Sequence, residues 1–255
     1  MDVQAEEASF LPVTGDTFKF SCHKGIACFT HCCAKLNLVL TPYDILRLKK
    51  RLGVSSEDFL EKFTDTKVDS NSRFPRVTLK MNGDKNGTCP FVTPEGCSIY
   101  EDRPGACRFY PLGRAAMKLD RDVRAKEKFF LVRETHCRGF EENREWTVQE
   151  WISNEGLEEY NVLNDLWLEI VTSQRSLGPE ARISRKLQMF FMASYNLDKF
   201  REFLFKSPFF ERFEVDADQK EAMAADDTAL MKFAFQWLKF SLFGQETMQI
   251  KKPGP

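Results

Sequence analysis

The sequence predicts a mostly α-helical fold with minor β structure, in which an irregular, cysteine-rich and metal-organised N-terminal half precedes a helical C-terminal half. Three observations support this fold class. All eight cysteines lie between residues 22 and 137 of the 255-residue chain. Glycine and proline are frequent among them, which is typical of irregular loops. From residue 147 onward, apolar side chains recur at steps of three and four, the spacing of one face of a helix.

The uneven placement of cysteine also sets the expected domain boundaries. We expect a flexible N-terminus at 1–13, a cysteine-cluster metal-binding domain at 14–140, a helical region packed on it at 141–250, and a frayed tail at 251–255. No segment repeats with a period of about 20 to 50 residues, which excludes a solenoid.

Composition and charge narrow the class of protein. The chain is 42% hydrophobic and 29% charged, which is typical of a folded domain, and its net charge of −1 does not favour binding to nucleic acid. The first 13 residues lack the features of a secretory signal, and no apolar stretch reaches the roughly 18 residues that cross a bilayer. We therefore expect a cytoplasmic protein with no membrane partner, whose reduced thiols bind metal rather than form disulfides.

Residues 41–53 carry the signals of a capped helix. Thr41 can cap the first turn, Pro42 suits the first helical position, and Asp44 stands where a capping box requires an acid. Apolar residues then follow at helical spacing, and Gly53 is expected to end the helix.

A second helix is expected to begin at Ser55 or Ser56 and to continue to Phe63. It is acidic, which argues against a DNA-reading pair of helices. Arg76–Met81 alternates like a strand, and Asn82-Gly83 is typical of a hairpin turn. The residues that follow, up to 111, should be irregular.

The C-terminal half contains three stretches with helical periodicity. They are Thr147–Thr172, with a break expected at Gly156, then Arg182–Phe205 and Ala217–Phe243. Phenylalanine and tryptophan recur along these stretches, and we interpret this aromatic stripe as core rather than as a cofactor site.

The cysteines fall into two sets and one outlier. The candidate metal ligands are Cys22, Cys28, Cys32 and Cys33 in the first set, Cys89, Cys97 and Cys107 in the second, and Cys137. Eight thiolates suit two four-thiolate sites, the number that a zinc ion or an iron–sulfur cubane takes. Buried free thiols or disulfides are the alternative.

The spacing of the thiols matches none of the familiar metal motifs. Paired Cys-x2-Cys knuckles, the ferredoxin run and the radical S-adenosylmethionine triad are all absent from the sequence. The adjacent pair Cys32-Cys33 is expected to serve different irons or different sites. All-sulfur donors exclude calcium and magnesium, and nearby phenylalanines would exclude water. This favours an iron–sulfur cluster, of the 4Fe-4S type, over zinc, and zinc stays open.

Charged residues near the thiols have secondary roles in this interpretation. Arg103 and Arg108 flank Cys107 and are candidate cofactor-binding residues that would offset thiolate charge. The three histidines, His23, His31 and His136, each stand beside a cysteine and are expected at the rim of the site rather than as ligands.

The segment from 103 to 138 is strongly basic. It holds ten basic and four acidic side chains, a local charge of +6. We expect a solvated helix or strand pair there, balanced by the acidic residues 141–150. A binding site for an anionic substrate, a cofactor phosphate or RNA is the alternative.

The order of motifs resembles one known family. Phe-x-Cys, then Cys-x3-Cys-Cys, Leu-Thr-Pro-x-Asp-Ile, Cys-Pro-Phe and Cys-x-Ile-Tyr-x-x-Arg-Pro-x-x-Cys-Arg-x-Tyr-Pro are similar to the YkgJ-type cysteine-cluster family of zinc- or iron-chelating domains. The resemblance covers about residues 18–114, with Cys137 outside the motif, and implies metal chelation.

The resemblance leaves the use of the metal open. The flagellin lysine-N-methylases are a similar group, which implies an iron–sulfur-dependent methyltransferase using S-adenosylmethionine as one alternative. A second alternative is a four-cysteine zinc site that stabilises the fold of an interaction protein. A third is a cluster used for redox chemistry or electron transfer. The sequence assigns no catalytic residue and no protein partner, and it contains no hydrolase or nucleotide-binding motif.

Overall fold

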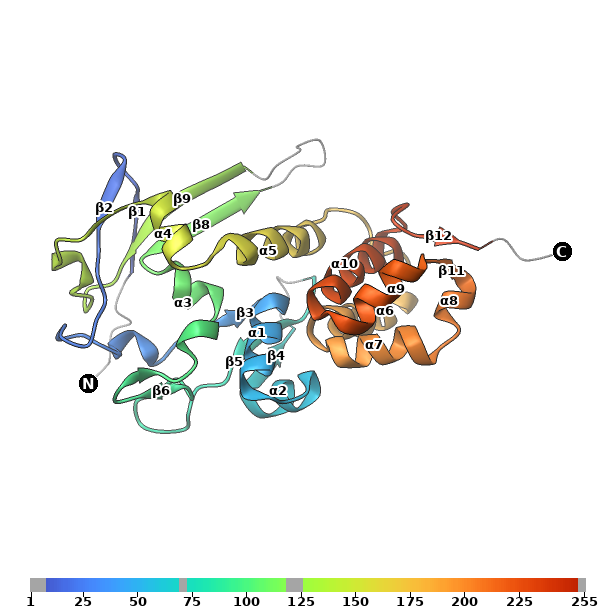
Figure 1. Ribbon diagram of the computed structural model, residues 1–255, viewed down its shortest axis with the longest axis horizontal. Coiled ribbons are helices and arrows are strands. Elements are labelled where there is room, and N and C mark those ends of the chain that lie inside the picture. The colour runs from blue at the N-terminus through green and yellow to red at the C-terminus, as the bar shows by residue number, and fades with distance from the viewer. Residues whose placement is uncertain (1–7, 69–72, 118–125, 252–255) are drawn as a thin grey trace. The chain divides into compact units, whose positions relative to one another are not determined.

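The computed structural model describes residues 8–68, 73–117 and 126–251 (Figure 1). The chain forms two compact units. The first combines Met1–Leu38 with Lys80–Asp165, and the second combines Val39–Leu79 with Leu166–Pro255. The fold is mixed, with helices predominating over strands, as the sequence predicts in outline. The division into an N-terminal and a C-terminal half is not confirmed, because each unit takes a segment from both sides of it.

The described residues of the first unit form three small antiparallel sheets. The largest has the strand order β1-β9-β8, in which Leu131 of β9 lies opposite Leu11 of β1 and Leu112 of β8. The strands of this unit are β1 (Ser9–Pro12), β2 (Thr17–Lys19), β6 (Val92–Thr93), β7 (Gly96–Cys97), β8 (Leu112–Met117), β9 (Lys126–Arg133) and β10 (Glu145–Thr147). β2 pairs with β10, and β6 with β7.

Two predictions from the sequence can be compared with these strands. Within the basic segment, residues 112–117 and 126–133 form the strand pair β8 and β9 (Figure 1), while Lys118, Asp120, Arg121, Asp122 and Arg124 lie outside the described residues. Residues 9–12, within the segment expected to be flexible, form β1, and residues 1–7 lie outside the description.

Short helices connect the sheets of the first unit around an aromatic core. They are the 3-10 helices η1 (His31–Cys33), η2 (Tyr100–Asp102) and η3 (Gly139–Glu141), and the α-helices α3 (Gly105–Phe109) and α4 (Val148–Asn154). The helix α5 (Glu158–Val171) begins in this unit, and its last residues belong to the second unit. Phe20 and Trp151 pack edge to face at 5.6 Å, and the Trp146 indole donates to the Phe20 carbonyl over 2.9 Å. The predicted break lies between α4 and α5, where Gly156 has a φ of +61°, a conformation that glycine adopts without steric cost.

The second unit begins with a three-stranded sheet and two capped helices. The sheet has the order β3 (Val39–Leu40), β5 (Arg76–Leu79), β4 (Thr64–Lys67), and the helices are α1 (Pro42–Leu52) and α2 (Ser56–Phe63). The predicted capping box is confirmed. The Thr41 N–H donates to Asp44 Oδ2 over 2.7 Å, and the Asp44 N–H donates to Thr41 Oγ1 over 3.2 Å. Gly53 ends α1 and Ser55 caps α2, as predicted.

The hairpin predicted at Asn82-Gly83 is wrong. β5 ends at Leu79, and no strand in the described part of the chain folds back on it directly after residue 83. The Asp84 carboxylate instead closes a loop, because it accepts the backbone N–H groups of Asn86 and Thr88 over 2.9 and 3.1 Å. This local hydrogen bonding competes with strand pairing.

The rest of the second unit is helical and aromatic. Its elements are α6 (Glu180–Tyr195), α7 (Leu197–Lys206), α8 (Phe209–Arg212), α9 (Ala217–Ala225), α10 (Asp227–Phe243) and the short strands β11 (Phe213–Glu214) and β12 (Gln249–Ile250). Two stretches predicted as single helices are each two helices, because Asn196 and Asp226 cap new helices within them. The aromatic stripe is core, as expected: Phe190, Phe200 and Phe235 are buried.

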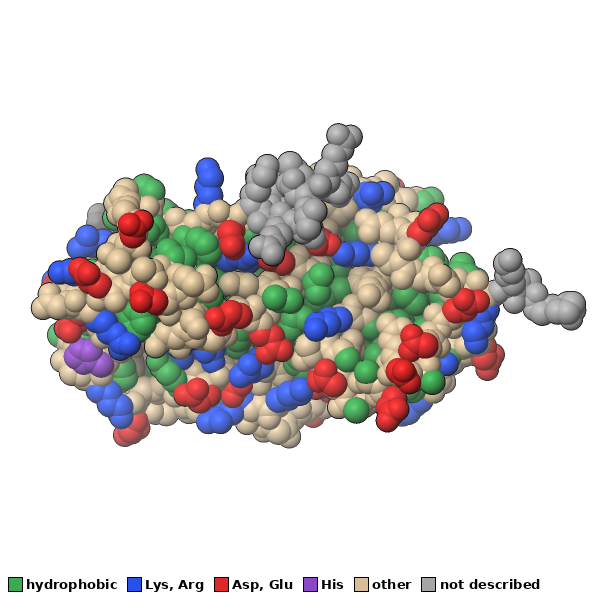
Figure 2. All heavy atoms as spheres, turned by 45° about the horizontal axis from the view of Figure 1, so that its top comes forward, with side chains coloured by type: hydrophobic (Ala, Val, Ile, Leu, Met, Phe, Trp, Pro, Cys, Tyr) green, Lys and Arg blue, Asp and Glu red, His purple; other side chains and the backbone are tan. Residues whose placement is uncertain are grey.

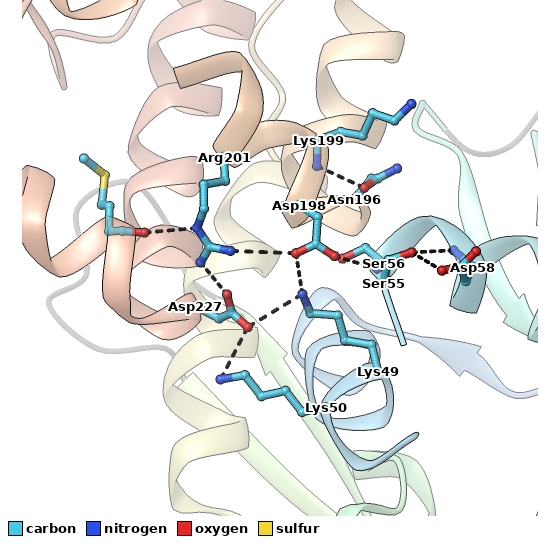
Figure 3. A network of polar contacts seen from close by, with 11 residues as sticks. Lys49, Lys50, Ser55, Ser56, Asp58, Asn196, Asp198, Lys199, Arg201 and Asp227 are labelled. Atoms are coloured by element: carbon cyan, nitrogen blue, oxygen red, sulfur yellow. Dashed lines mark hydrogen bonds and ion pairs between the residues drawn. The ribbon is translucent and has the colours of Figure 1, made fainter. Parts of the chain in front are cut away.

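A network of charged groups joins α1, α7 and α10 in this unit (Figure 3). Lys49 is buried, and its Nζ lies 2.7 Å from Asp198 Oδ1 and 3.6 Å from Asp227 Oδ2. Lys50 Nζ lies 3.4 Å from the same Asp227 oxygen, and the Arg201 guanidinium bonds the other one. Every charge in the network therefore faces an opposite charge.

The network holds both carboxylates ionised. Burial alone would raise the pKa of Asp198, but hydrogen bonds from Lys49 and from the Ser56 N–H outweigh burial and lower it. Burial would also raise the pKa of Asp227. The hydrogen bond from Arg201 and the charges of the two lysines outweigh burial, and the pKa of Asp227 is lowered. The network thus contains an opposite charge for each of its charged groups.

Candidate metal centre

The first four cysteines lie on a tightly curled loop in the first unit. Cys22 follows β2, Cys28 lies in a turn, and Cys32 and Cys33 belong to η1. Thr30, just before η1, has a φ of +66°, a left-handed conformation that is uncommon for a residue other than glycine. The loop is thus held in a conformation that brings its thiols near one another.

Four of the eight thiols influence one another's pKa, three from this loop and one from the segment of Cys137. The pKa of Cys22 is raised to about 11, first by burial of its sulfur among protein atoms and then by the thiols of Cys32, Cys28 and Cys137. The residue as a whole is nevertheless exposed. Burial, then the thiols of Cys28 and Cys32, raises the pKa of Cys137. We call Cys22, Cys28, Cys32 and Cys137 the central thiols.

Cys33 links the central thiols to the second set. A hydrogen bond with Cys33 is the main cause that raises the pKa of Cys32, followed by burial. The Cys33 carbonyl accepts the Cys89 N–H over 2.7 Å, and burial, with the nearby Cys97 thiol, raises the pKa of Cys89. Cys107 lies on α3. None of the eight cysteines, which all lie in the described part of the chain, forms a disulfide bond.

Two glycines allow these segments to approach closely. A Cβ on Gly139 would lie 2.4 Å from the Phe20 ring and 2.9 Å from the Ser21 carbonyl oxygen. A Cβ on Gly96 would lie 3.2 Å from the Phe29 ring. Gly139 therefore holds the segment of Cys137 against the segment of Cys22, and Gly96 leaves room for the ring that follows Cys28.

Backbone amides are directed at several of the sulfurs. The Arg138 N–H donates to Cys28 Sγ over 3.2 Å. The Gly139 N–H lowers the pKa of Cys137 against the effect of burial, and the N–H groups of Phe91 and Val92 do the same for Cys89. Such donors stabilise negative charge on sulfur and tune bound metal.

The residues fit a soft metal centre in their chemistry. The donors are thiols, amides point at their sulfurs, and the buried Tyr110 hydroxyl beside them has no well-oriented hydrogen-bond partner in the described part of the chain. However, no three Cys, His, Asp or Glu side chains within residues 8–68, 73–117 and 126–251 converge closely enough to share one metal ion.

The two arginines proposed as cofactor contacts have different surroundings. Arg108 is buried, and its guanidinium donates to the backbone carbonyls of Arg103, Glu101 and Glu155. Arg103 pairs with the Glu155 carboxylate, and its charge lowers the pKa of Cys22 against the other influences there. Arg108 thus ties α3 to its neighbours, Arg103 offsets thiolate charge, and cofactor binding by either stays a prediction.

The histidines form contacts outside the thiol group. His23 Nδ1 accepts the Gly25 N–H over 3.1 Å, and its Nε2 lies 3.4 Å from Glu142. His136 Nε2 lies 3.5 Å from Glu134, and the rings of His31 and His136 are 6.3 Å apart. These contacts agree with a place at the rim.

Sequence reasoning did not single out Tyr110. Its hydroxyl lies near Cys137, and each group changes the pKa of the other. The signal in the sequence is its position three residues after Cys107, just beyond α3. Nothing in the sequence relates Tyr110 to Cys137.

A comparison with protein families matches this segment. Residues 21–138 fit the CxxCxxCC family, described as a putative zinc- or iron-chelating domain. We call residues 21–138 the CxxCxxCC segment. The predicted resemblance is confirmed. The match extends beyond the expected end near residue 114, so that Cys137 lies inside the CxxCxxCC segment rather than outside the motif.

Other comparisons add no further likeness. No curated protein and no solved structure matches the chain significantly. On the face drawn in Figure 2, the basic and acidic side chains of the described residues are interspersed. Within the described residues, none of the helices combines the length and apolar character needed to span a bilayer.

Proposed function

We propose that the CxxCxxCC segment binds an iron–sulfur cluster of the 4Fe-4S type through the central thiols and uses it for electron transfer. The observation that carries this proposal is the grouping of Cys22, Cys28, Cys32 and Cys137, with a backbone N–H donated to the Cys28 sulfur. Such a cluster takes four cysteine ligands and exchanges single electrons at a potential set by hydrogen bonds to its sulfurs. The remaining thiols, Cys33, Cys89, Cys97 and Cys107, are proposed as further ligands.

The spacing of the central thiols supports a cluster over a single ion. Four sulfurs around zinc each lie about 2.3 Å from the metal, so they must converge to within about 4 Å of one another. The central thiols lie near enough to affect each other's charge, yet no three described ligand side chains converge on one ion. Ligands of a cluster bind different irons and therefore lie farther apart.

The surroundings suit a group that must be kept from water. Phe20, Ile26 and Phe91 are buried, and each stands two positions from a cysteine in the sequence. Phe29 follows Cys28 directly, and its ring packs against Gly96. Low exposure to solvent is one of the factors that set the reduction potential of a cluster.

A zinc site is the second candidate, and the surroundings of Cys89 favour it. Its sulfur faces the N–H groups of Phe91 and Val92, two and three residues later, and Cys97 lies nearby on β7. A turn that directs such amides at a thiolate is a feature of closed structural sites. A staple of this kind would contribute directly to folding.

The test is anaerobic purification followed by iron, sulfide and zinc analysis and an absorption spectrum. The proposal predicts a brown protein with a broad band near ~400 nm, about four irons and a reversible one-electron reduction. Cys28→Ser should lose most of the iron, whereas Ser98→Ala, a change of similar size in the same unit, should keep it. A colourless protein with about one zinc per four thiols would reject the cluster in favour of a structural site.

A further inference from the structure

Tyr110 is fixed in place by the aromatic core of the first unit. It follows α3, the helix of Cys107, and its ring packs edge to face on Phe20 with the ring centroids 5.7 Å apart. Phe20 is only 2% exposed and also packs on Phe140 and Trp151. The position of the Tyr110 hydroxyl is therefore set by side chains that have little freedom to move.

The Tyr110 hydroxyl lies near Cys137, one of the central thiols. It is fully buried and has no well-oriented partner among the described residues. The Cys137 thiol lies beside it. A phenol carries its proton at neutral pH and can donate a hydrogen bond to a thiolate.

A purely structural role would not require this hydroxyl. A buried hydroxyl without a partner is costly, and phenylalanine would fill the same space beside Phe20. Tyr160 shows the ordinary arrangement in the same unit, because its buried hydroxyl donates to the Arg103 carbonyl over 3.2 Å. The Tyr110 hydroxyl is explained if the Cys137 sulfur becomes a charged acceptor.

We infer that Tyr110 is a positioning residue of the metal centre, which donates its hydroxyl proton in a hydrogen bond to the Cys137 thiolate and raises the reduction potential of the bound cluster. This inference rests on the proposed function. A donor to a ligand sulfur withdraws electron density from it, and the cluster is then more easily reduced. No bond to hydrogen is broken, because the proton stays on the phenol.

The experiment compares Tyr110→Phe with Tyr160→Phe in anaerobically purified full-length protein. Iron and sulfide content are measured first, and the midpoint potential is then determined by spectroelectrochemical titration. Tyr110→Phe should keep its iron and show about a tenfold less favourable reduction, or about 59 mV for a one-electron couple. Tyr160→Phe should keep the wild-type potential, since its hydroxyl bonds a carbonyl.

The outcomes separate this inference from the proposed function. Wild-type protein without iron rejects the proposed function and the inference with it. Iron-loaded Tyr110→Phe with an unchanged potential overturns the inference alone. If Tyr110→Phe does not hold iron, 3-fluorotyrosine is incorporated at all tyrosines of the otherwise wild-type and Tyr160→Phe proteins. Its more acidic hydroxyl should raise both potentials, and unchanged potentials would overturn the inference.

Discussion

The two clusters of titratable groups in this protein differ in how their charge is balanced. In the second unit, Lys49, Lys50 and Arg201 face Asp198 and Asp227, and both carboxylates have lowered pKa values (Figure 3). In the first unit, the central thiols lie near one another, and the pKa values of Cys22, Cys32 and Cys137 are raised.

The difference indicates which cluster needs a partner from outside the chain. The charged network already contains its counter-ions, so it serves the stability of the fold. The thiols can all ionise only if a cation replaces their protons, which is what metal binding does. Neighbouring amides and Arg103 reduce this cost but do not remove it.

Metal removal should produce the largest effect and should be confined to the first unit. Metal bound by four thiolates contributes on the order of 10 kcal/mol to folding in small structural sites. After treatment with a chelator under reducing conditions, amides in η1 and α3 should lose protection from hydrogen exchange, while those in α6 and α10 keep theirs. If the amides in η1 and α3 were equally protected from exchange before and after chelation, the thiol cluster would not need a metal, and the contrast between the two clusters would be wrong.

Asp227→Asn should destabilise the second unit. The substitution leaves two lysines and Arg201 around Asp198 alone, and removing one partner of a largely buried ion pair costs about 3 kcal/mol. Urea unfolding measures the change. Glu202→Gln is the matched control, because it removes an exposed pair with Lys206 and should cost less than about 0.5 kcal/mol. If folded Asp227→Asn protein lost its iron, the claim that the two clusters act independently would be wrong.

Gly139→Ala should destabilise the metal centre sterically. The added Cβ meets the Phe20 ring and the Ser21 carbonyl, and overpacking of this kind costs about 1–3 kcal/mol. Iron content should fall because the segment of Cys137 moves away from that of Cys22. Gly83→Ala is the control, since a Cβ there meets nothing within 4 Å. Full iron content in Gly139→Ala would count against a ligand role for Cys137.

Acid should remove the contribution of the network gradually. The folded-state pKa values of Asp198 and Asp227 lie below the ordinary value of 3.8. Their stabilising effect is therefore complete above about pH 5 and is lost as the pH falls through the lowered values. The difference in unfolding free energy between wild type and Asp227→Asn should shrink from pH 5 to about pH 3. A difference that stays constant would mean that the charges contribute nothing.

Local signals in the sequence predicted local structure well. Thr41, Asp44 and Gly53 define α1 because capping requires only neighbouring residues. The splits at Asn196 and Asp226 were missed, because apolar spacing continues through both positions and only the cap geometry reveals the new helix. At Asn82-Gly83, the Asp84 carboxylate outweighed the turn signal.

The composition of the candidate site could be predicted, but not its grouping. Eight thiols and the family motif indicate metal chelation from the sequence alone. The association of Cys137 with Cys28 depends on a contact between segments about a hundred residues apart, made by the Arg138 N–H and allowed by Gly139. Tyr110 was missed for the same reason, because the role of its hydroxyl depends on its contact with Cys137, which the sequence does not reveal.

The most direct test of the central claim is native mass spectrometry of the anaerobically purified protein and of Cys137→Ser. The account predicts that the wild-type chain carries the added mass of four irons and four sulfides, the composition of one 4Fe-4S cluster, which is lost under denaturing conditions. The Cys137→Ser chain should carry less or none. A wild-type mass equal to that of the bare chain, or a Cys137→Ser chain that keeps the full added mass, would contradict a metal centre at the central thiols.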